Sequence, residues 1–447
     1  MRVHITVDPR VSRNEFAAVH INTPGVAAAH LDLEYTRVLD TCGPGPDITA
    51  DLLLIGACVY AIDKAVLRGS FPDRWTRQLE VTFPVSDPAR WEAGQEALQA
   101  CLSYLTGDVW QISFSEAGVA LVQPSDRRVG VGTCADAAAV SLFSGGLDSL
   151  IGVIDWLETH TGKKLLLVGH HDRHATGPKN DQELVFGPLS AEYDWRVSRL
   201  SARVGLMPAG PEITFRSRSL LFLTLGLHAA STIGPDTPVL IPENGTIALN
   251  VPLTPARRGS CSTRTAHPFY LELLGTALTK VGITNPILNP LQTKTKGECV
   301  RDCLNQAVLQ ATYAYSISCA KRGHRRSWVR RDAPQCGRCM PCIYRRAALS
   351  PTGWDNGKHY GNDVRTGEVP VTGARVSGND LRACLAFLQR QPSTNEIASR
   401  LLANGSLPID DLRASAALVE RAMEEVRTLF RARGTDPEVR RAAGLGR

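Results

Sequence analysis

The sequence predicts an α/β protein whose central domain is an open, doubly wound and mostly parallel sheet, flanked by an N-terminal α+β region and a C-terminal helical region. The main observation is an order of elements. An apolar run at residues 137–143 is followed by a helical pattern at 147–160 and by a second apolar run at 163–171. Strand, helix and strand in this order are typical of a parallel sheet. We therefore expect three domains, with the bounds 1–135, 136–350 and 351–447.

The N-terminal region mixes strand and helix patterns. Residues 2–7 and 77–85 alternate apolar and polar side chains, as half-buried strands do. Residues 51–67 and 91–105 have apolar side chains at helical spacing, and residues 110–114 are typical of a further strand. We find no catalytic pattern here, and we interpret the region as a structural or partner-binding extension.

The rest of the chain continues the alternation of strands and helices. An apolar helix at 219–231 precedes a buried-strand candidate at 237–241, which ends in a turn-prone Pro-Glu-Asn-Gly segment. In the C-terminal region, residues 378–391 and 410–432 both fit amphipathic helices. We interpret this last region as a small helical cap.

Composition excludes several classes of protein. Hydrophobic residues make up 43% and charged residues 21%, as in ordinary soluble globular proteins. The start has no apolar segment typical of a secretory signal, and no stretch approaches the ~18 apolar residues that cross a membrane. Twelve cysteines without such a signal favour reduced thiols or metal ligands, so we expect a cytoplasmic protein without membrane contact. The net charge of +6 permits contact with phosphates but does not single out nucleic acid.

The most informative segment is SGGLDS, which lies directly between the predicted strand at 137–143 and the predicted helix. Two adjacent glycines let the backbone adopt positive φ and let an anion come close. The N–H groups and the dipole at the start of the helix favour negative charge there. Asp148 would repel a phosphate by itself, so we expect Mg²⁺ between them. The predicted phosphate-binding residues are Ser144, Gly145, Gly146, Leu147, Asp148 and Ser149.

Two better-known motifs do not fit this segment. The Walker A pattern is absent, and Leu142 occupies the first glycine position of a nucleophile elbow. An ordinary tight turn between strand and helix remains the structural alternative.

Four cysteines have the spacing of a metal site: Cys319, Cys336, Cys339 and Cys342. A C-x2-C unit lets two thiolates reach one ion from a tight turn, and a distant cysteine completes a tetrahedron. An iron–sulfur cluster is the alternative, but Arg346 stands where ferredoxins place a further cysteine. We therefore predict a structural Zn²⁺ with no open position for catalysis.

The SGGLDS segment resembles the pyrophosphate loop of the PP-loop ATP pyrophosphatases, which cleave ATP between the α- and β-phosphates and adenylate a substrate. The cysteine spacing is similar to that of the 7-cyano-7-deazaguanine synthase family, QueC. Segments similar to that family also occur in the same order at 215–223, at Pro290-Leu291 and at Lys296-Gly297-Glu298. The resemblance covers residues 136–350. It implies an adenine nucleotide alpha hydrolase-like fold, with ATP, Mg²⁺ and Zn²⁺ as ligands.

The resemblance also suggests roles for charged residues. Arg218 and Lys296 are implied to stabilise negative charge at the phosphates, which makes them catalytic candidates together with Asp148. The structural alternative for each is a solvated surface charge. Glu243 and Asn244 follow a predicted strand, where ligands collect in doubly wound sheets, and are candidates to contact substrate or adenine.

Further candidates have structural alternatives of similar weight. Arg264 and His267 are candidates to bind a carboxylate or transfer a proton. His170, His171 and His174 could suggest a metal site, but they end a predicted strand without a carboxylate partner, so we expect them at the surface. Residues 321–331 hold six Lys or Arg and are candidates to contact nucleic acid, ATP or an acidic partner, or they form a solvated basic loop.

Two departures from QueC put the substrate in doubt. QueC proteins are about half as long, and their acidic substrate segment is replaced here by residues 241–250 and 262–269. The longer layout resembles the QueC-like proteins of bacterial anti-phage operons, the QatC family of the Qat system. This implies a C–N ligase that adenylates a 7-deazaguanine-type carboxylate, releases pyrophosphate and passes the product to an amine. The amine is then ammonia or the amino group of a partner protein from the same operon, such as a QatB-like protein. Alternatives are a true 7-cyano-7-deazaguanine synthase, a tRNA-sulfurating PP-loop enzyme and a non-catalytic subunit of a defence complex.

Overall fold

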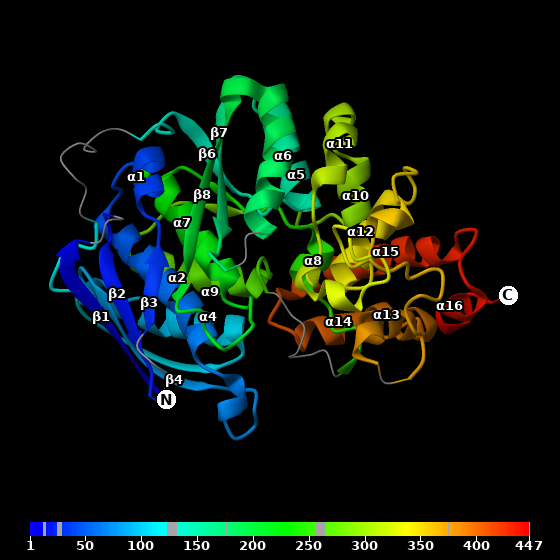
Figure 1. Cartoon of the computed structure of the whole chain (residues 1–447), viewed down its shortest axis with the longest axis horizontal. Coiled ribbons are helices and arrows are strands. Elements are labelled where there is room, and N and C mark those ends of the chain that lie inside the picture. Colours follow the sequence, from blue (N-terminus) through cyan, green and yellow to red (C-terminus); the bar gives the residue numbers. More distant parts are fainter. Residues whose placement is uncertain are drawn as a thin grey trace. The chain divides into compact units, whose positions relative to one another are not determined.

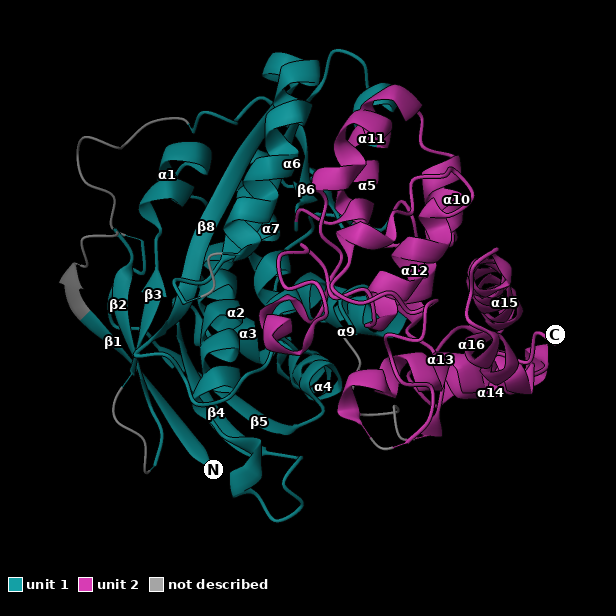
Figure 2. Ribbon diagram, turned by 45° about the vertical axis from the view of Figure 1, so that its right-hand side comes forward, with its two compact units in different colours: residues 1–144, 156–241, 263–289 teal, residues 145–155, 242–262, 290–447 magenta. Residues whose placement is uncertain are grey.

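The computed structural model describes residues 1–11, 15–24, 29–122, 132–174, 177–255, 264–373 and 375–446. These residues fall into two compact units, coloured separately in Figure 2. Unit 1 comprises residues 1–144, 156–241 and 263–289, and unit 2 comprises residues 145–155, 242–262 and 290–447. The units cut across the three segments expected from the sequence, whose bounds stay a prediction.

Unit 1 contains a ten-stranded sheet in the order β10-β9-β6-β7-β8-β3-β2-β1-β4-β5. Figure 1 labels β1 to β4 and β6 to β8 of this sheet. Its strands are β1 (Arg2–Val11), β2 (Ala17–Asn22), β3 (Ala29–Leu33), β4 (Gln78–Val85), β5 (Val109–Glu116), β6 (Ala137–Leu142), β7 (Lys164–His171), β8 (Val197–Met207), β9 (Val239–Leu240) and β10 (Ile287–Leu288). The neighbours from β10 to β8 and from β1 to β5 are parallel, whereas β3 pairs antiparallel with both β8 and β2, and β2 with β1. The predicted α/β class with a mostly parallel sheet is therefore confirmed, and it is compatible with a Rossmann-like arrangement.

Strand β8 belongs to two ladders at once. Its residues 197–203 pair with β7, and its residues 204–207 pair with β3. The strands of the N-terminal region therefore continue the central sheet.

The helices of unit 1 are α1 (Thr36–Cys42), α2 (Asp47–Ala65), α3 (Pro88–Glu92), α4 (Gln95–Thr106), α6 (Gly177–Tyr193), α7 (Arg218–Ile233) and α9 (Pro268–Lys280). Helices α2 and α7 are apolar on most sides because they pack against each other and against the sheet. Their approach is close at Gly56, where a Cβ would lie 2.3 Å from Thr224 Oγ1. Because crossovers between parallel strands are right-handed, α6 and α7 lie on opposite faces of the sheet, and the winding reverses between β6 and β9.

Unit 2 is mainly helical. Its helices are α5 (Leu147–Thr159), whose last turn belongs to unit 1, α8 (Gly245–Leu249), α10 (Lys296–Arg301), α11 (Gln306–Thr312), α12 (Met340–Leu349), α13 (Asn379–Arg390), α14 (Thr394–Leu402), α15 (Ile409–Arg431) and α16 (Pro437–Ala442). The amphipathic helices α13 to α15 bury their apolar faces in one core together with residues of α8 and α12. Nowhere in the part of the chain that the structure describes is a helix both long and apolar enough to cross a membrane.

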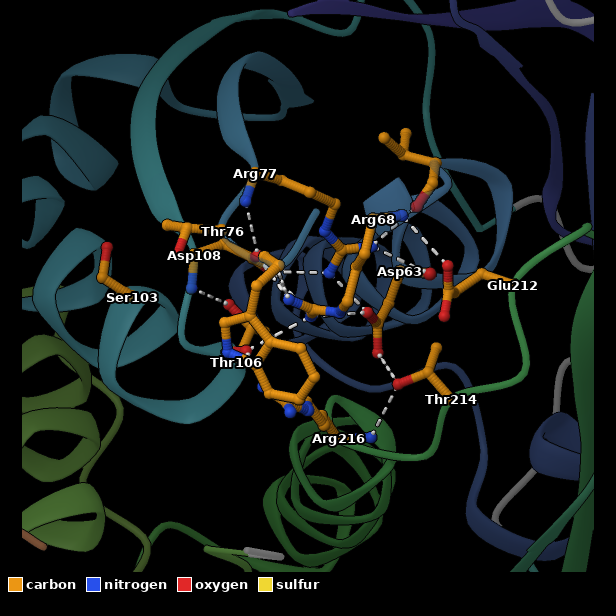
Figure 3. A network of polar contacts seen from close by, with 12 residues as sticks. Asp63, Arg68, Thr76, Arg77, Ser103, Thr106, Asp108, Glu212, Thr214 and Arg216 are labelled. Carbon is orange, nitrogen blue, oxygen red and sulfur yellow. Dashed lines mark hydrogen bonds and ion pairs between the residues drawn. The ribbon is translucent and has the colours of Figure 1, made fainter. Parts of the chain in front are cut away.

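A buried network of charges stabilises unit 1 (Figure 3). Arg77 is fully buried and donates to Asp63 Oδ1 and Asp108 Oδ2, both at 2.5 Å, and Arg68 donates to Asp108 Oδ1 at 2.7 Å. Burial alone would raise the pKa of Asp63, but the Arg77 guanidinium outweighs it and holds that pKa below its usual value. Asp63 Oδ2 also accepts a 2.8 Å hydrogen bond from the hydroxyl of Ser217, the residue before α7. Through Asp63, which lies on α2, the network therefore holds the start of α7 in place.

We expect the substitution Arg77→Met to lower the free energy of unfolding by about 3 kcal/mol, because it leaves two buried carboxylates with one arginine fewer. Urea unfolding would measure the change. Arg2→Met is the matched control, since Arg2 and Glu80 form an ion pair with side chains 63% and 50% exposed. The control should change stability by less than about 1 kcal/mol. A value for Arg77→Met as small as the control would show that the network is not stabilising.

Candidate functional site

The SGGLDS segment forms the turn between β6 and α5, where the sequence predicts it. Gly145 has a φ of 77°, a left-handed conformation that favours glycine. The hydroxyl of Ser149 accepts from the N–H of Gly146 at 3.1 Å and donates to its carbonyl at 2.9 Å. Ser144 is exposed, whereas Leu147 and Ser149 are buried. The turn is thus a glycine-rich loop at the start of a long helix, which is the local geometry that suits a phosphate.

A second segment supports this loop from within unit 2. The Ile317 N–H donates to the Gly145 carbonyl at 2.9 Å, and the Ser318 hydroxyl lies 3.5 Å from the Leu147 N–H. The Arg345 guanidinium donates to the hydroxyl of Ser316 at 2.8 Å. The backbone of the loop is therefore fixed by residues 316–318, far along the chain.

Asp148 is held between two side chains from other segments. Lys296 Nζ donates to Asp148 Oδ1 at 2.5 Å, and Asn244 Nδ2 donates to Asp148 Oδ2 at 2.8 Å. Lys296 is 3% exposed and Asn244 is fully buried, so the Asp148 carboxylate meets both groups away from bulk water. We call Asn244, Asp148 and Lys296 the aspartate clamp.

Local sequence explains how each residue of the clamp is oriented. Asn244 is the N-cap of α8, and its Oδ1 accepts from the Ile247 N–H at 3.2 Å, so its Nδ2 must face Asp148. Lys296 is the first residue of α10, which begins with a capping box formed by Thr295 and Glu298. The clamp therefore consists of side chains at the first turns of three helices.

Each clamp segment follows one strand of unit 1 along the chain. The neighbouring parallel strands β6, β9 and β10 are each followed along the chain by one clamp segment. The winding of the sheet reverses between β6 and β9, and ligands of doubly wound sheets bind beyond the carboxyl ends of the strands at such a point. Glu243, a predicted substrate contact, precedes Asn244 and is half-buried.

Arg218 lies in unit 1, at the first position of α7. Its Nε donates to His170 Nδ1 at 3.3 Å, and His170 Nε2 donates to the Val204 carbonyl at 2.9 Å. Burial, followed by the charge of Arg218, lowers the pKa of His170 to about 3, so the ring is neutral and its Nδ1 lone pair is available. The expectation that His170 and His171 lie at the surface is wrong, because they are only 1% and 7% exposed. The cause is that they end the central strand β7 instead of starting a loop.

Arg264 and His267 also lie in unit 1. The Arg264 guanidinium donates to the Tyr104 carbonyl and lies 4.1 Å from the centroid of the Tyr104 ring. His267 is the N-cap of α9, and its Nδ1 accepts from the Phe269 N–H at 3.2 Å. Burial, followed by Arg264, lowers the pKa of His267 to about 4. Residues 262 and 263 of the predicted substrate segment lie outside the described residues.

The four predicted cysteines converge in unit 2. Their sulfur atoms all lie within 4.8 Å of one another, and those of Cys336 and Cys342 are 3.9 Å apart. A tetrahedral site with Zn–S bonds of about 2.3 Å requires sulfur atoms about 3.8 Å apart. Three of the cysteines are buried and Cys319 is half-buried. The cluster could therefore bind a metal ion such as zinc.

Backbone geometry prepares the sulfur atoms of this cluster. Cys336 Sγ accepts from the N–H groups of Arg338 at 3.4 Å and Cys339 at 3.3 Å. Gly337 has a φ of 77°, and a Cβ there would lie 2.1 Å from the Asn362 carbonyl oxygen. Hydrogen bonding, first with Cys319 and then with the other thiols, holds the pKa of Cys336 well below its usual value. A turn that stabilises thiolates in this way is typical of a metal site.

The basic loop 321–331 lies within the same segment, and part of its charge is neutralised. Lys321 pairs with Asp380 at 2.6 Å and Arg330 with Glu368 at 2.7 Å. Arg325 and Arg326 are exposed. A contact of this loop with nucleic acid stays a prediction.

We expect the purified protein to contain about one zinc ion per chain, and Cys339→Ser to lose it, because three ligands leave the tetrahedron incomplete. Elemental analysis would measure zinc and iron together. Cys384→Ser is the matched control, since Cys384 is buried in the helical core of unit 2 outside the cluster. Iron in place of zinc, or equal zinc in Cys339→Ser and the control, would contradict the prediction.

The structure thus brings together Asp148, Asn244 and Lys296, which the sequence singled out in separate segments. Arg218, Arg264 and His267 belong to the other unit. Sequence reasoning missed the role of His170, which no local motif signals. Comparisons with family models, with curated proteins and with solved structures find no match for this chain.

Proposed function

We propose that this chain is an ATP-consuming C–N ligase of the PP-loop type, similar to QueC, which activates a carboxylate as an adenylate. The observation that supports this most is the aspartate clamp. A lysine, an asparagine and an aspartate from three segments meet at the start of α5, directly after a glycine-rich loop. A purely structural turn would not need a nearly buried lysine at this point, because burying an ion pair brings little net stability.

The proposed reaction has two steps. A carboxylate oxygen of the substrate bonds to the α-phosphorus of ATP while the bond from that phosphorus to the bridging oxygen breaks, so that pyrophosphate leaves and an acyl adenylate remains. An amine nitrogen then bonds to the acyl carbon, AMP leaves and the nitrogen loses a proton. The product is an amide. Both steps build negative charge on phosphate oxygens, which fixed positive groups stabilise.

Each charged or polar residue of the candidate site would have its own role toward the phosphates of ATP. The loop from Ser144 to Ser149 and the start of α5 would bind the pyrophosphate portion of ATP. Asp148 would hold Mg²⁺, which neutralises phosphate charge when bound. Lys296 is within hydrogen-bond reach of that carboxylate and would stabilise the charge that develops at the phosphates. Arg218, held by His170 in unit 1, would offer its guanidinium group to an anionic group.

The cysteine cluster would have a supporting role. Its first cysteine, Cys319, directly follows the residues that hold the backbone of the loop, Ile317 and Ser318. A zinc ion with four thiolate ligands would therefore stabilise the segment beneath the phosphates without taking part in the reaction. Such a site favours a ligase of the QueC type over tRNA sulfuration, which would use a redox-active cysteine pair or a cluster.

The resemblance to QueC and to the QatC family suggests the substrate class. The carboxylate would belong to a 7-deazaguanine-type compound, and the amine would be ammonia or an amino group of a partner protein such as a QatB-like protein. A partner protein is favoured over ammonia as the amine, because the segment around Asn244 replaces the acidic substrate segment of QueC.

We expect Lys296→Met to slow pyrophosphate release from ATP, Mg²⁺ and 7-carboxy-7-deazaguanine by about a hundredfold, since it removes a fixed cation. Lys294→Met is the control, because Lys294 lies two residues away, is 35% exposed and pairs with Asp302 at 3.7 Å. Its rate should equal that of the wild type. An equal loss of rate in both variants would contradict the proposed role of Lys296. A wild type that releases no pyrophosphate would contradict the proposed activity.

If the acceptor is a protein, the intact mass of the neighbouring operon product should increase when it is co-expressed with the wild type. Asp148→Ala should abolish the increase, and Asp136→Ala should not, because Asp136 forms only an exposed ion pair with Lys164. Mass spectrometry decides between the acceptors. An unchanged partner mass with the wild type would leave ammonia as the amine.

A further inference from the structure

Helix α15 presents three side chains on one face toward the first turns of α8 and α10. Leu418, Arg421 and Glu425 are spaced by three and four residues, so they lie along one side of the helix. Leu418 also belongs to the core of unit 2, to which the other side of the helix contributes Val419, Met423, Val426 and Phe430. Core packing therefore fixes the position of the helix, and with it the positions of Arg421 and Glu425.

Two of these side chains bind the first turn of α10, where Lys296 begins the helix. Glu425 accepts a short hydrogen bond from the hydroxyl of Thr295 and a 3.1 Å hydrogen bond from the Gly297 N–H. These two residues flank Lys296 on both sides. A carboxylate at this position also interacts favourably with the positive end of the helix dipole.

Arg421 adds a second contact, one turn earlier on α15. It donates to Glu298 Oε1 at 2.7 Å and to the Thr293 carbonyl at 3.2 Å. Glu298 is itself the capping-box residue of α10. Both ends of the first turn of α10 are thus bound to α15.

The third side chain contacts α8, which follows Asn244. A Cβ at Gly245 would lie 2.6 Å from Leu418 Cδ1 and 2.1 Å from the Gln292 carbonyl oxygen. Only glycine therefore fits between α15 and the chain that leads to α10. The two residues that hold the oxygens of Asp148 begin helices that both rest on α15.

We propose that α15 positions the aspartate clamp and that Glu425 is the positioning residue for Lys296. The two hydrogen bonds of Glu425 fix the backbone on either side of Lys296, so the direction of the ammonium group toward Asp148 depends on a carboxylate far along the chain. Glu425 would position Lys296 whatever reaction the protein catalyses, whereas the effect of Glu425 on catalysis rests on the proposed function.

The first measurement uses the full-length protein without nucleotide. Acylation of lysines by an amine-reactive probe, followed by mass spectrometry, reports how well each ammonium group is held. In Glu425→Ala the acylation rate of Lys296 should rise about tenfold. The reason is that the hydrogen bonds from Thr295 and Gly297 to the charged Glu425 carboxylate are lost, and Lys296 is then held less firmly. Glu425→Gln retains one acceptor oxygen and should give an intermediate rate.

Glu424→Ala is the matched control. Glu424 precedes Glu425 on the same helix but pairs with Arg427 at 2.6 Å and Arg431 at 2.7 Å on α15 itself. It should leave the acylation of Lys296 unchanged. Lys64, paired with Asp172 in unit 1, serves as an internal reference for general loosening of the fold.

Two outcomes would overturn the inference. One is an unchanged acylation rate of Lys296 in Glu425→Ala, and the other is an equal rise at Lys64, which would indicate general destabilisation. In a second arm, Glu425→Ala should lower kcat for pyrophosphate release about tenfold, with the KM for ATP less affected. A wild type that releases no pyrophosphate would count against the proposed function alone, because the acylation arm still tests the role of Glu425.

Discussion

The ion pair between Asp148 and Lys296 is the interaction on which the candidate site depends. A carboxylate that is mostly withdrawn from water is unfavourable unless charged and hydrogen-bonding partners meet it. Here the partners come from segments 96 and 148 residues away along the chain, so the carboxylate is satisfied only when three distant segments of unit 2 meet. The site therefore forms only when unit 2 has its tertiary structure.

Three separate parts of unit 2 support this interaction. Residues 316–318, next to the cysteine cluster, fix the backbone of the glycine-rich loop. The N-cap of α8 orients Asn244, and the capping box of α10 orients Lys296. Helix α15 contacts the last two. The N-cap and the capping box are hydrogen bonds to backbone at a helix start, where unpaired N–H groups make such bonds effective.

The sequence predicts those parts of the fold and site that are local. SGGLDS between an apolar strand and a helix, and the C-x2-C spacing, are contiguous signals, and both lie where they were expected. Strand β9 lies within the buried-strand candidate at 237–241, whereas β10 has only two residues, too few for a periodic signal. The contacts of His170 and Glu425 could not be predicted, because a buried histidine or a helical glutamate looks the same whatever distant partner it meets.

Strand β8 has a consequence for the position of Arg218. Its pairing changes from β7 to β3 between Arg203 and Val204, so this short part of β8 joins the central strands to the N-terminal strands. The carbonyl of Val204 at that joint receives the hydrogen bond from His170, whose other ring nitrogen holds Arg218. The position of the Arg218 guanidinium group therefore depends, through one histidine ring, on the place where the N-terminal strands join the central sheet.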